Sequence, residues 1–288
     1  SDLTVAETEV ILALGNFAGT KSDVDVSDSA VNIMSGGDQV LDNPGIDIVT
    51  VSDGPVGAAD GAAINAFTAE VEFDVNATAS ELAAEVAGAN VGDELDEANS
   101  VVVASGGPDV TAEEAHAIQD ISGYVGTQSD YDISDSAANL ISAGNHVLDV
   151  SGVTSISVDD GPATASEGAA LNSLNPAITF DVTDTADKIA DEVSGTGKTG
   201  TELDEAGVVQ AINAFTAEVE FAVSADEAEA IQNVTGYDAS GSSYEIEDTA
   251  AALISATDAD LNDVAVSYVE VINGVTGNDE VTAVDRPP

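Results

Sequence analysis

The side chains of this sequence that could do chemistry are carboxylates, and the chemistry they favour is calcium binding. Calcium takes about six to eight oxygen ligands from carboxylates and turn carbonyls. The spaced aspartates of an EF-hand loop and the glycine-rich nonapeptide of calcium-binding β-rolls are absent. The aspartates at turns or clustered along an expected strand are Asp53, Asp130, Asp132, Asp159 and Asp160. We predict these five as metal ligands, with calcium as the candidate cofactor, although each also suits a role as a helix cap, a turn former or a solvated side chain.

The histidines do not indicate a catalytic site. His116 stands where related segments of the chain carry Glu9 and Glu229, and His146 stands where another segment carries Gln39. Positions that exchange with Glu and Gln are typical of a solvated surface. The chain has no Cys, and no lysine lies at a spacing that would serve as the base for a serine nucleophile. We therefore expect no enzyme. A polysaccharide-acting enzyme is the least favoured reading, because sugars often stack on Trp and the chain has none.

Composition excludes other classes of function. The 288 residues include 55 acidic and only 4 basic side chains, which gives a formal net charge of −51. Such a chain cannot neutralise a run of phosphates, so we expect no nucleic-acid partner. It has no apolar run of about 18 residues, so we expect no membrane insertion. Because self-repulsion at this charge is strong unless salt screens it, an extracellular or cell-surface setting is expected.

The sequence repeats itself. VDVSDSAVNI from Val24 matches YDISDSAANL from Tyr131, 107 residues later, and YEIEDTAAALISA from Tyr244 matches the latter at a further 113 residues. We predict two long units, 1–110 and 111–223, and a partial third unit, 224–288. The decapeptide INAFTAEVEF occurs from both Ile64 and Ile212 outside this frame, which suggests that each unit is a row of smaller equivalent modules.

Each module is predicted to be a short strand followed by a short Ala-rich helix. Alternation of β-branched or aromatic residues with polar ones indicates strands that start near 24, 48, 71, 131, 155 and 178. An aspartate followed by Ser or Thr and then Ala is a helix-start signal, with the aspartate as a cap. It occurs at Asp28, Asp135, Asp184 and Asp248. ELDEA, from Glu94 and again from Glu202, is also expected to be helical.

Strand starts spaced by about 23–25 residues favour crossovers between parallel strands. The predicted fold class is therefore an α/β repetitive solenoid of short parallel strands and short Ala-rich helices. Tandem compact α+β domains are the alternative.

Two motifs carry a resemblance to a known class of repeat. Y-x-I-x-D-[ST]-A-x-N-[IL] stands at Tyr131, and V-x-x-I-x-V-x-D follows at Val153. Together they resemble a repeat of very large secreted and cell-surface proteins of marine cyanobacteria and proteobacteria. The resemblance covers most of the chain. It implies an extracellular, structural or adhesive role, often with calcium, and it supplies no catalytic residues.

The expected function is that of a self-associating extracellular structural protein, such as a subunit of a filament, a surface layer or an adhesin stalk. A monomeric calcium- or glycan-binding adhesion module is the alternative. Because the third unit is partial and the first begins without a preceding cap, both ends of the predicted solenoid should be open. We expect a head-to-tail homo-oligomer in which the segment 264–271 of one molecule meets the N-terminal segment of the next. The alternative is that the sequence is a piece of a longer chain, in which the same contacts join covalent neighbours.

Overall fold

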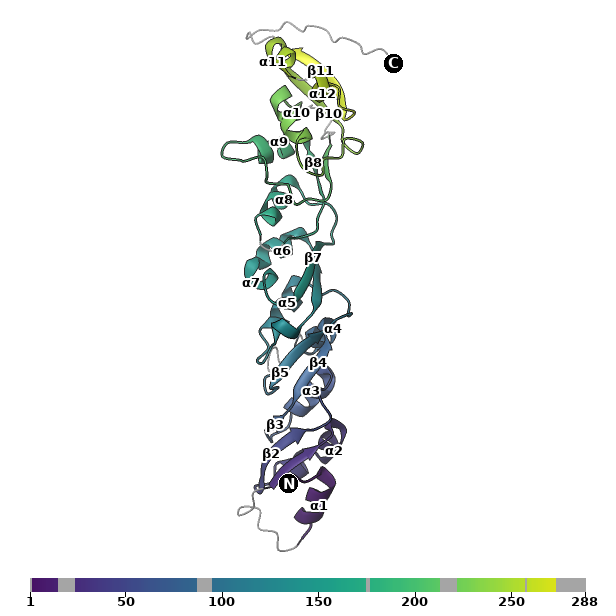
Figure 1. The fold of residues 1–288 in the computed structure, drawn as a ribbon, viewed down its shortest axis with the longest axis vertical. Coiled ribbons are helices and arrows are strands. Elements are labelled where there is room, and N and C mark those ends of the chain that lie inside the picture. Colours follow the sequence, from purple (N-terminus) through teal and green to yellow (C-terminus); the bar gives the residue numbers. More distant parts are fainter. Residues whose placement is uncertain are drawn as a thin grey trace. The chain divides into compact units, whose positions relative to one another are not determined.

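The computed structural model describes residues 2–14, 24–86, 95–174, 177–212, 222–256 and 258–272. Within them the fold is mixed α/β (Figure 1). The helices are α1 (Val5–Leu12), α2 (Ala30–Leu41), α3 (Ala58–Asn65), α4 (Ala79–Val86), α5 (Ala112–Gln119), η2 (Gly126–Gln128), α6 (Ala137–Ala143), α7 (Asn145–Leu148), α8 (Ala165–Asn172), α9 (Ala186–Ser194), α10 (Ala225–Gln232), α11 (Ala250–Ser255) and α12 (Asp258–Leu261). The strands are β1 (Val24–Asp28), β2 (Ile46–Val51), β3 (Val71–Glu72), β4 (Asp74–Thr78), β5 (Ser100–Ala104), β6 (Tyr131–Asp135), β7 (Val153–Val158), β8 (Val182–Thr185), β9 (Val209–Ile212), β10 (Tyr244–Thr249) and β11 (Val266–Ile272).

By its internal contacts the chain divides into two compact units. One consists of Ser1–Ser134 with His146–Ser155, and the other of Asp135–Asn145 with Ile156–Pro288. This division differs from the sequence repeats 1–110, 111–223 and 224–288, which stay a prediction.

The strands pair in short parallel sets. In the first unit β1 pairs with β2, β2 with β3, and β4 with β5, all in parallel. In the second unit β8 pairs with β9 and β10 with β11, again in parallel. The predicted α/β class with short parallel strands is confirmed. The strand expected near 178 is an isolated bridge at Thr179, and β8 begins later, at Val182.

Two kinds of helix alternate along the described chain. We call α1, α3, α5, α8 and α10 the A helices and α2, α4, α6, α9 and α11 the B helices. Each A helix has eight residues and follows a single residue that bridges to a strand later in the chain, as Leu3 does to Val26. Each B helix begins within two residues of the end of a strand. An A helix is therefore preceded by a single bridging residue and a B helix by a strand, and the two arrangements alternate along the chain.

Four of the five A helices start with a side-chain cap that we did not predict from the sequence. In α1 the Thr4 hydroxyl accepts a hydrogen bond from the Glu7 N–H, and the Glu7 carboxylate accepts one from the Thr4 N–H at 2.9 Å. This reciprocal pair, a capping box, satisfies two backbone donors that would otherwise lack partners at the helix start. The same box opens α5, α8 and α10. Hydrogen bonds from the Thr4 N–H and hydroxyl hold the pKa of Glu7 below its ordinary value.

The aspartates predicted as helix caps stand one residue too early. The N-cap of α6 is Ser136, whose hydroxyl accepts from the Asn139 N–H at 3.2 Å. Likewise Thr249, which follows Asp248, is the N-cap of α11. Both residues of an Asp-Ser or Asp-Thr pair can cap a helix, and the backbone geometry selects the second. Because the following Ser or Thr is the N-cap, the aspartate carboxylate can accept hydrogen bonds from other groups.

Helices pack in chain order within each unit, mainly an A helix against a B helix, and α10 also contacts the short helix α12. In the first unit α1 contacts α2, α2 contacts α3, α3 contacts α4, and α4 contacts α5. In the second unit α6 contacts α8, α8 contacts α9, α9 contacts α10, and α10 contacts α11. Small side chains also let A helices lie close to the strands and turns beside them. A Cβ at Gly168 of α8 would lie only 2.7 Å from Cγ2 of Val182 and 3.0 Å from Cδ2 of Leu203, and the same crowding surrounds Gly61 of α3.

Two sequence expectations are corrected by this fold. The described ELDEA residues form turns rather than helices, in which Leu95 and Leu203 are fully buried. The side chain of Asn65 accepts a hydrogen bond from the Glu97 N–H, a contact between residues far apart in the sequence that replaces a helical bond. INAFTAEVEF does not mark one equivalent module, since Ile64 lies in α3 and Ile212 ends β9. The rest of the second copy lies outside the described residues.

Candidate functional site

The aspartates at the strand ends join one helix to the next. Asp28 Oδ2 accepts a hydrogen bond at 3.0 Å from the N–H of Val5, the first residue of α1. Its Oδ1 accepts from the N–H of Ser29 and from the Asn32 amide, both at 2.8 Å, at the start of α2. Asp28 therefore serves two helix starts at once. A negative charge is favourable at both, because the free N–H groups of a helix start carry partial positive charge.

The same bridge recurs in the second unit. Asp184 accepts from the N–H of Ala165 at 3.0 Å, and Asp248 accepts from the N–H of Ala225 at 3.1 Å. Each carboxylate also accepts from the N–H of the next residue in the chain. Burial alone would raise the pKa of Asp28, yet the hydrogen bonds from Asn32, Ser29 and Val5 together hold that pKa below its ordinary value.

Two of the predicted calcium ligands perform a similar task. Asp53 Oδ1 accepts from the N–H of Ala30 at 3.0 Å, and Asp160 Oδ1 accepts from the N–H of Ala137 at 3.2 Å. Ala30 and Ala137 are the first residues of B helices α2 and α6. One carboxylate oxygen of each aspartate thus holds a helix start that precedes it in the chain by 23 residues.

The other predicted ligands lie on a strand or next to the end of one. Asp130 and Asp132 accept from the hydroxyls of Thr154 and Ser155, both at 2.5 Å. The N–H of Asp159 donates to the Asp135 carbonyl at 3.1 Å. Among the described residues, no group of three or more His, Cys, Asp or Glu side chains has an arrangement that could hold a metal ion. Calcium binding at these five aspartates stays a prediction.

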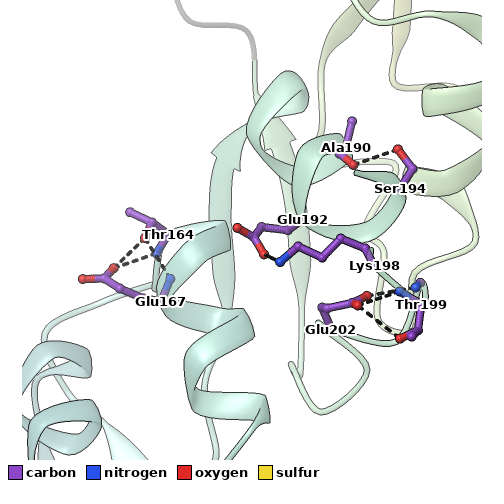
Figure 2. Close-up of polar contacts among 9 residues, drawn as sticks. Thr164, Glu167, Ala190, Glu192, Ser194, Lys198, Thr199 and Glu202 are labelled. Atoms are coloured by element: carbon purple, nitrogen blue, oxygen red, sulfur yellow. Dashed lines mark hydrogen bonds and ion pairs between the residues drawn. The ribbon is translucent and has the colours of Figure 1, made fainter. Parts of the chain in front are cut away.

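The cationic side chains described lie at the surface. Figure 2 shows Lys198 reaching Glu192, and this hydrogen bond raises the pKa of the lysine. The figure also shows the Thr164–Glu167 pair of the α8 capping box. His116 faces the exposed Asp120 on α5, with Nε2 and Oδ2 3.7 Å apart. Lys21 lies outside the described residues. These contacts involve no serine hydroxyl placed against a base.

A second recurrent polar feature is a bracket built from a glutamine and a tyrosine. The Gln119 amide, at the end of α5, donates to the Tyr131 hydroxyl at 2.8 Å and to the Val147 carbonyl at 2.9 Å. Gln232 does the same with the Tyr244 hydroxyl and the Asp260 carbonyl, at 2.8 and 2.9 Å. Burial raises the pKa of both tyrosines, so both remain neutral hydroxyls. The bracket fastens the end of an A helix to the following strand and loop.

The first coil of the chain, residues 3–14 with β1, presents an apolar surface that we call the N-end surface. Leu14 is 55% exposed, whereas its counterparts in the later repeats, Ile121 and Val234, are 4% and 5% exposed. Ile11 is half-buried, although the matching residues of the other A helices are fully buried. A shallow hollow here is lined by Leu3, Ala6, Glu7, Val10 and Ile11.

The last described coil, α11 to β11, presents a second apolar surface, the C-end surface. Four of its apolar residues are half-buried or exposed, whereas their counterparts in both earlier repeats are buried. They are Ala250, Leu253, Leu261 and Val269, with counterparts Ala30 and Ala137, Ile33 and Leu140, Leu41 and Leu148, and Val49 and Ile156. Beside them Ile254 is 85% exposed. Sequence reasoning expected open ends, but which residues they expose follows only from this comparison.

Comparison of the chain with protein-family models, with curated proteins and with solved structures finds no match. Within the described residues, no helix is both long and apolar enough to span a bilayer.

Proposed function

We propose that this protein is an extracellular structural repeat protein whose copies associate through their ends, as a subunit of a filament, a surface layer or an adhesin stalk. The observation that carries the proposal is the loss of burial at both ends of the described chain. Ile118 and Ile231 are fully buried, whereas the equivalent Ile11 is half-buried. At the other end, Leu140 is fully buried and the equivalent Leu253 is half-buried.

The proposal includes a solenoid as the arrangement of the coils. In a solenoid each coil is stabilised mainly by its neighbours, so an uncapped end coil leaves apolar surface exposed. Alternating helices, parallel strands and the aspartate bridges between successive helices support this arrangement. The bridge from Asp28 to the N–H of Val5 and its equivalents at Asp184 and Asp248 are contacts of this neighbour-to-neighbour kind.

Salt should control the association. Two copies of a chain with a net charge of −51 repel one another strongly at low ionic strength. Screening shortens from about 10 Å at 0.1 M salt to about 3 Å at 1 M salt. Contact between the apolar ends therefore becomes favourable in high salt, such as a saline exterior provides.

Light scattering of the full-length chain over a range of protein concentrations tests the proposal. In about 1 M NaCl, where screening is short, the weight-average mass should rise with concentration, and in dilute buffer it should stay near that of one 28.7 kDa chain. A second series with added calcium, matched in ionic strength, separates screening from specific binding. A chain that remains monomeric at high concentration in all three solutions would overturn the proposed function.

A further inference from the structure

We propose that the association is head-to-tail with one specific joint: α1 of one copy packs on the C-end surface of another copy, in the position that an A helix occupies after α2 and α6. This inference rests on the proposed function, and it fixes the polarity and the contact surfaces. Its occupant is a second copy of the same chain.

The alternation of helices supplies the polarity. Each B helix before α11 is followed and contacted by an A helix, as α2 is by α3 and α6 is by α8. The described chain begins with A helix α1 and its last A or B helix is B helix α11. Joining the C-end surface to the N-end surface therefore continues the alternation. Head-to-head contact, between two N-end surfaces, would pack an A helix on an A helix. Tail-to-tail contact, between two C-end surfaces, would pack a B helix on a B helix.

The helix α1 has the features of the helices whose place it would take. It is eight residues long, like α3 and α8, and it opens with the same capping box as α8. The helix positions that face a neighbour are also apolar, since Ile11 corresponds to Ile64 and Leu171, which are fully buried in α3 and α8. The side chains that α1 leaves exposed are thus of the type that the inner A helices bury.

The strand edge at the C-end surface indicates what covers it. In β7 the Ile156 carbonyl accepts from the Thr179 N–H at 2.8 Å, and the Val158 N–H donates to the Thr179 carbonyl at 3.0 Å. The counterparts of Ile156 and Val158 in β11 are Val269 and Val271. The strand β11 pairs with β10 in parallel, and no other described strand pairs with β11. Thr179 belongs to the coil of A helix α8. The strand edge and the helix face of the C-end surface therefore both match a following coil of A type.

Two blocked variants test the joint. Leu14→Glu places a charge on the N-end surface, and Ile254→Glu places one on the C-end surface. Both residues are more than half exposed in a single copy, so circular dichroism should show folded protein. Val31→Glu is the matched control, because Val31 is 67% exposed on α2 but lies on neither end surface. The readout is sedimentation velocity at high protein concentration in about 1 M NaCl.

A head-to-tail joint predicts that each blocked variant is monomeric alone and that their equimolar mixture forms a dimer and nothing larger. The mixture keeps one intact N-end surface and one intact C-end surface, which make a single joint. The Val31→Glu control should associate like the unchanged chain. Dimers of Leu14→Glu alone would show tail-to-tail contact, and dimers of Ile254→Glu alone would show head-to-head contact. Either result, or a monomeric mixture beside an associating unchanged chain, would overturn the joint.

Association of a shortened chain that ends at Ile272 shows which segment occupies the C-end surface. The shortened chain should associate at least as strongly as the full chain, since β11 is kept. If the shortened chain associates while the full chain is monomeric, residues 273–288 compete for this surface, and a second copy is not its normal occupant. If no version of the chain associates under any condition, the proposed function itself fails.

Discussion

The segment that carries α1 and its two later copies, which carry α5 and α10, have similar sequences but bury their apolar side chains to different extents. The helix of α1 has the same length and the same capping box as α5 and α10. Nevertheless Leu14 is 55% exposed, whereas Ile121 and Val234 are almost completely buried. The helices α5 and α10 each pack against a preceding B helix, α4 or α9. The greater burial of Ile121 and Val234 therefore accompanies the packing of α5 and α10 against a preceding B helix.

The same comparison shows a difference in polar contacts. Gln119 and Gln232 each hold a tyrosine hydroxyl and a loop carbonyl, whereas the first repeat carries Leu12 and Val24 at the corresponding glutamine and tyrosine positions. The glutamine–tyrosine bracket is therefore found at α5 and α10, and the first repeat has no residues that could form it.

The largest predicted effect comes from truncating matching isoleucines. Ile118→Ala should lower the free energy of unfolding by about 2–5 kcal/mol, because it leaves a cavity in a packed core. Ile11→Ala should lower it by less than half as much, since Ile11 is half-buried. Urea unfolding at low protein concentration, where copies stay separate, measures both. Equal losses would contradict the claim that the first coil is incompletely packed.

A smaller effect is expected from adding one methyl group to an inner helix. The Gly168→Ala variant should lose about 1–3 kcal/mol, because its Cβ would lie 2.7 Å from Cγ2 of Val182. Gly57→Ala is the control, since it has a negative φ of −71° and no atom within 4 Å of an added Cβ. If thermal unfolding ranks the two variants the other way, the close packing of α8 described here is wrong.

Breaking the glutamine–tyrosine bracket should cost about 1 kcal/mol, the usual net worth of a hydrogen bond. Tyr131→Phe removes the hydroxyl that accepts from Gln119, while the bond from Gln119 to the Val147 carbonyl at 2.9 Å remains. Tyr244→Phe should behave alike, because Gln232 retains its bond to the Asp260 carbonyl. Denaturant unfolding of the two variants should give similar losses, and an unchanged stability in both would show that the bracket contributes nothing.

The smallest expected effect is a pH dependence at Asp28. Its hydrogen bonds lower the folded-state pKa below the ordinary value of 3.8. The carboxylate therefore contributes stability that is fully present well above pH 3.8 and is lost as the pH falls through the lower folded-state value. The difference in melting temperature between the unchanged chain and Asp28→Asn should shrink as the pH falls from about 6 to about 3. The comparison belongs in about 1 M NaCl, because protonation elsewhere also relieves charge repulsion. A difference independent of pH would contradict the bridging role of Asp28.

Much of the local structure could be predicted from the sequence. Period-two alternation located β6 and β10, and the Asp-Ser or Asp-Thr signal located the starts of α6 and α11. The capping boxes have a local sequence signal, Thr or Ser followed three residues later by Glu, but we did not predict them. The role of the aspartates in joining two helix starts could not be predicted from the sequence. It depends on a helix start that lies about 20 residues earlier in the chain, and no local spacing shows which backbone N–H is near.

Long-range contacts account for the features that the sequence did not show. ELDEA has a helical composition, but burial of Leu203 and the hydrogen bond from the Glu205 N–H to the Asn172 side chain hold it in a turn. Asp53 and Asp160 resemble metal ligands in sequence, and the fold shows that each also holds the start of a B helix. The differing exposure of Leu14 and Ile121 is invisible in the sequence, since both are apolar residues at equivalent positions.

The central claim is that another copy covers the exposed end coil, and the chain's lack of cysteine allows a direct measurement. Leu14→Cys introduces a single thiol on the N-end surface, and Thr127→Cys introduces one at an exposed position of η2. Maleimide labelling rates are measured against protein concentration in about 1 M NaCl. The account predicts that labelling at position 14 slows as copies associate, while labelling at position 127 stays constant. Unchanged labelling at position 14, in samples whose light scattering shows association, would contradict it.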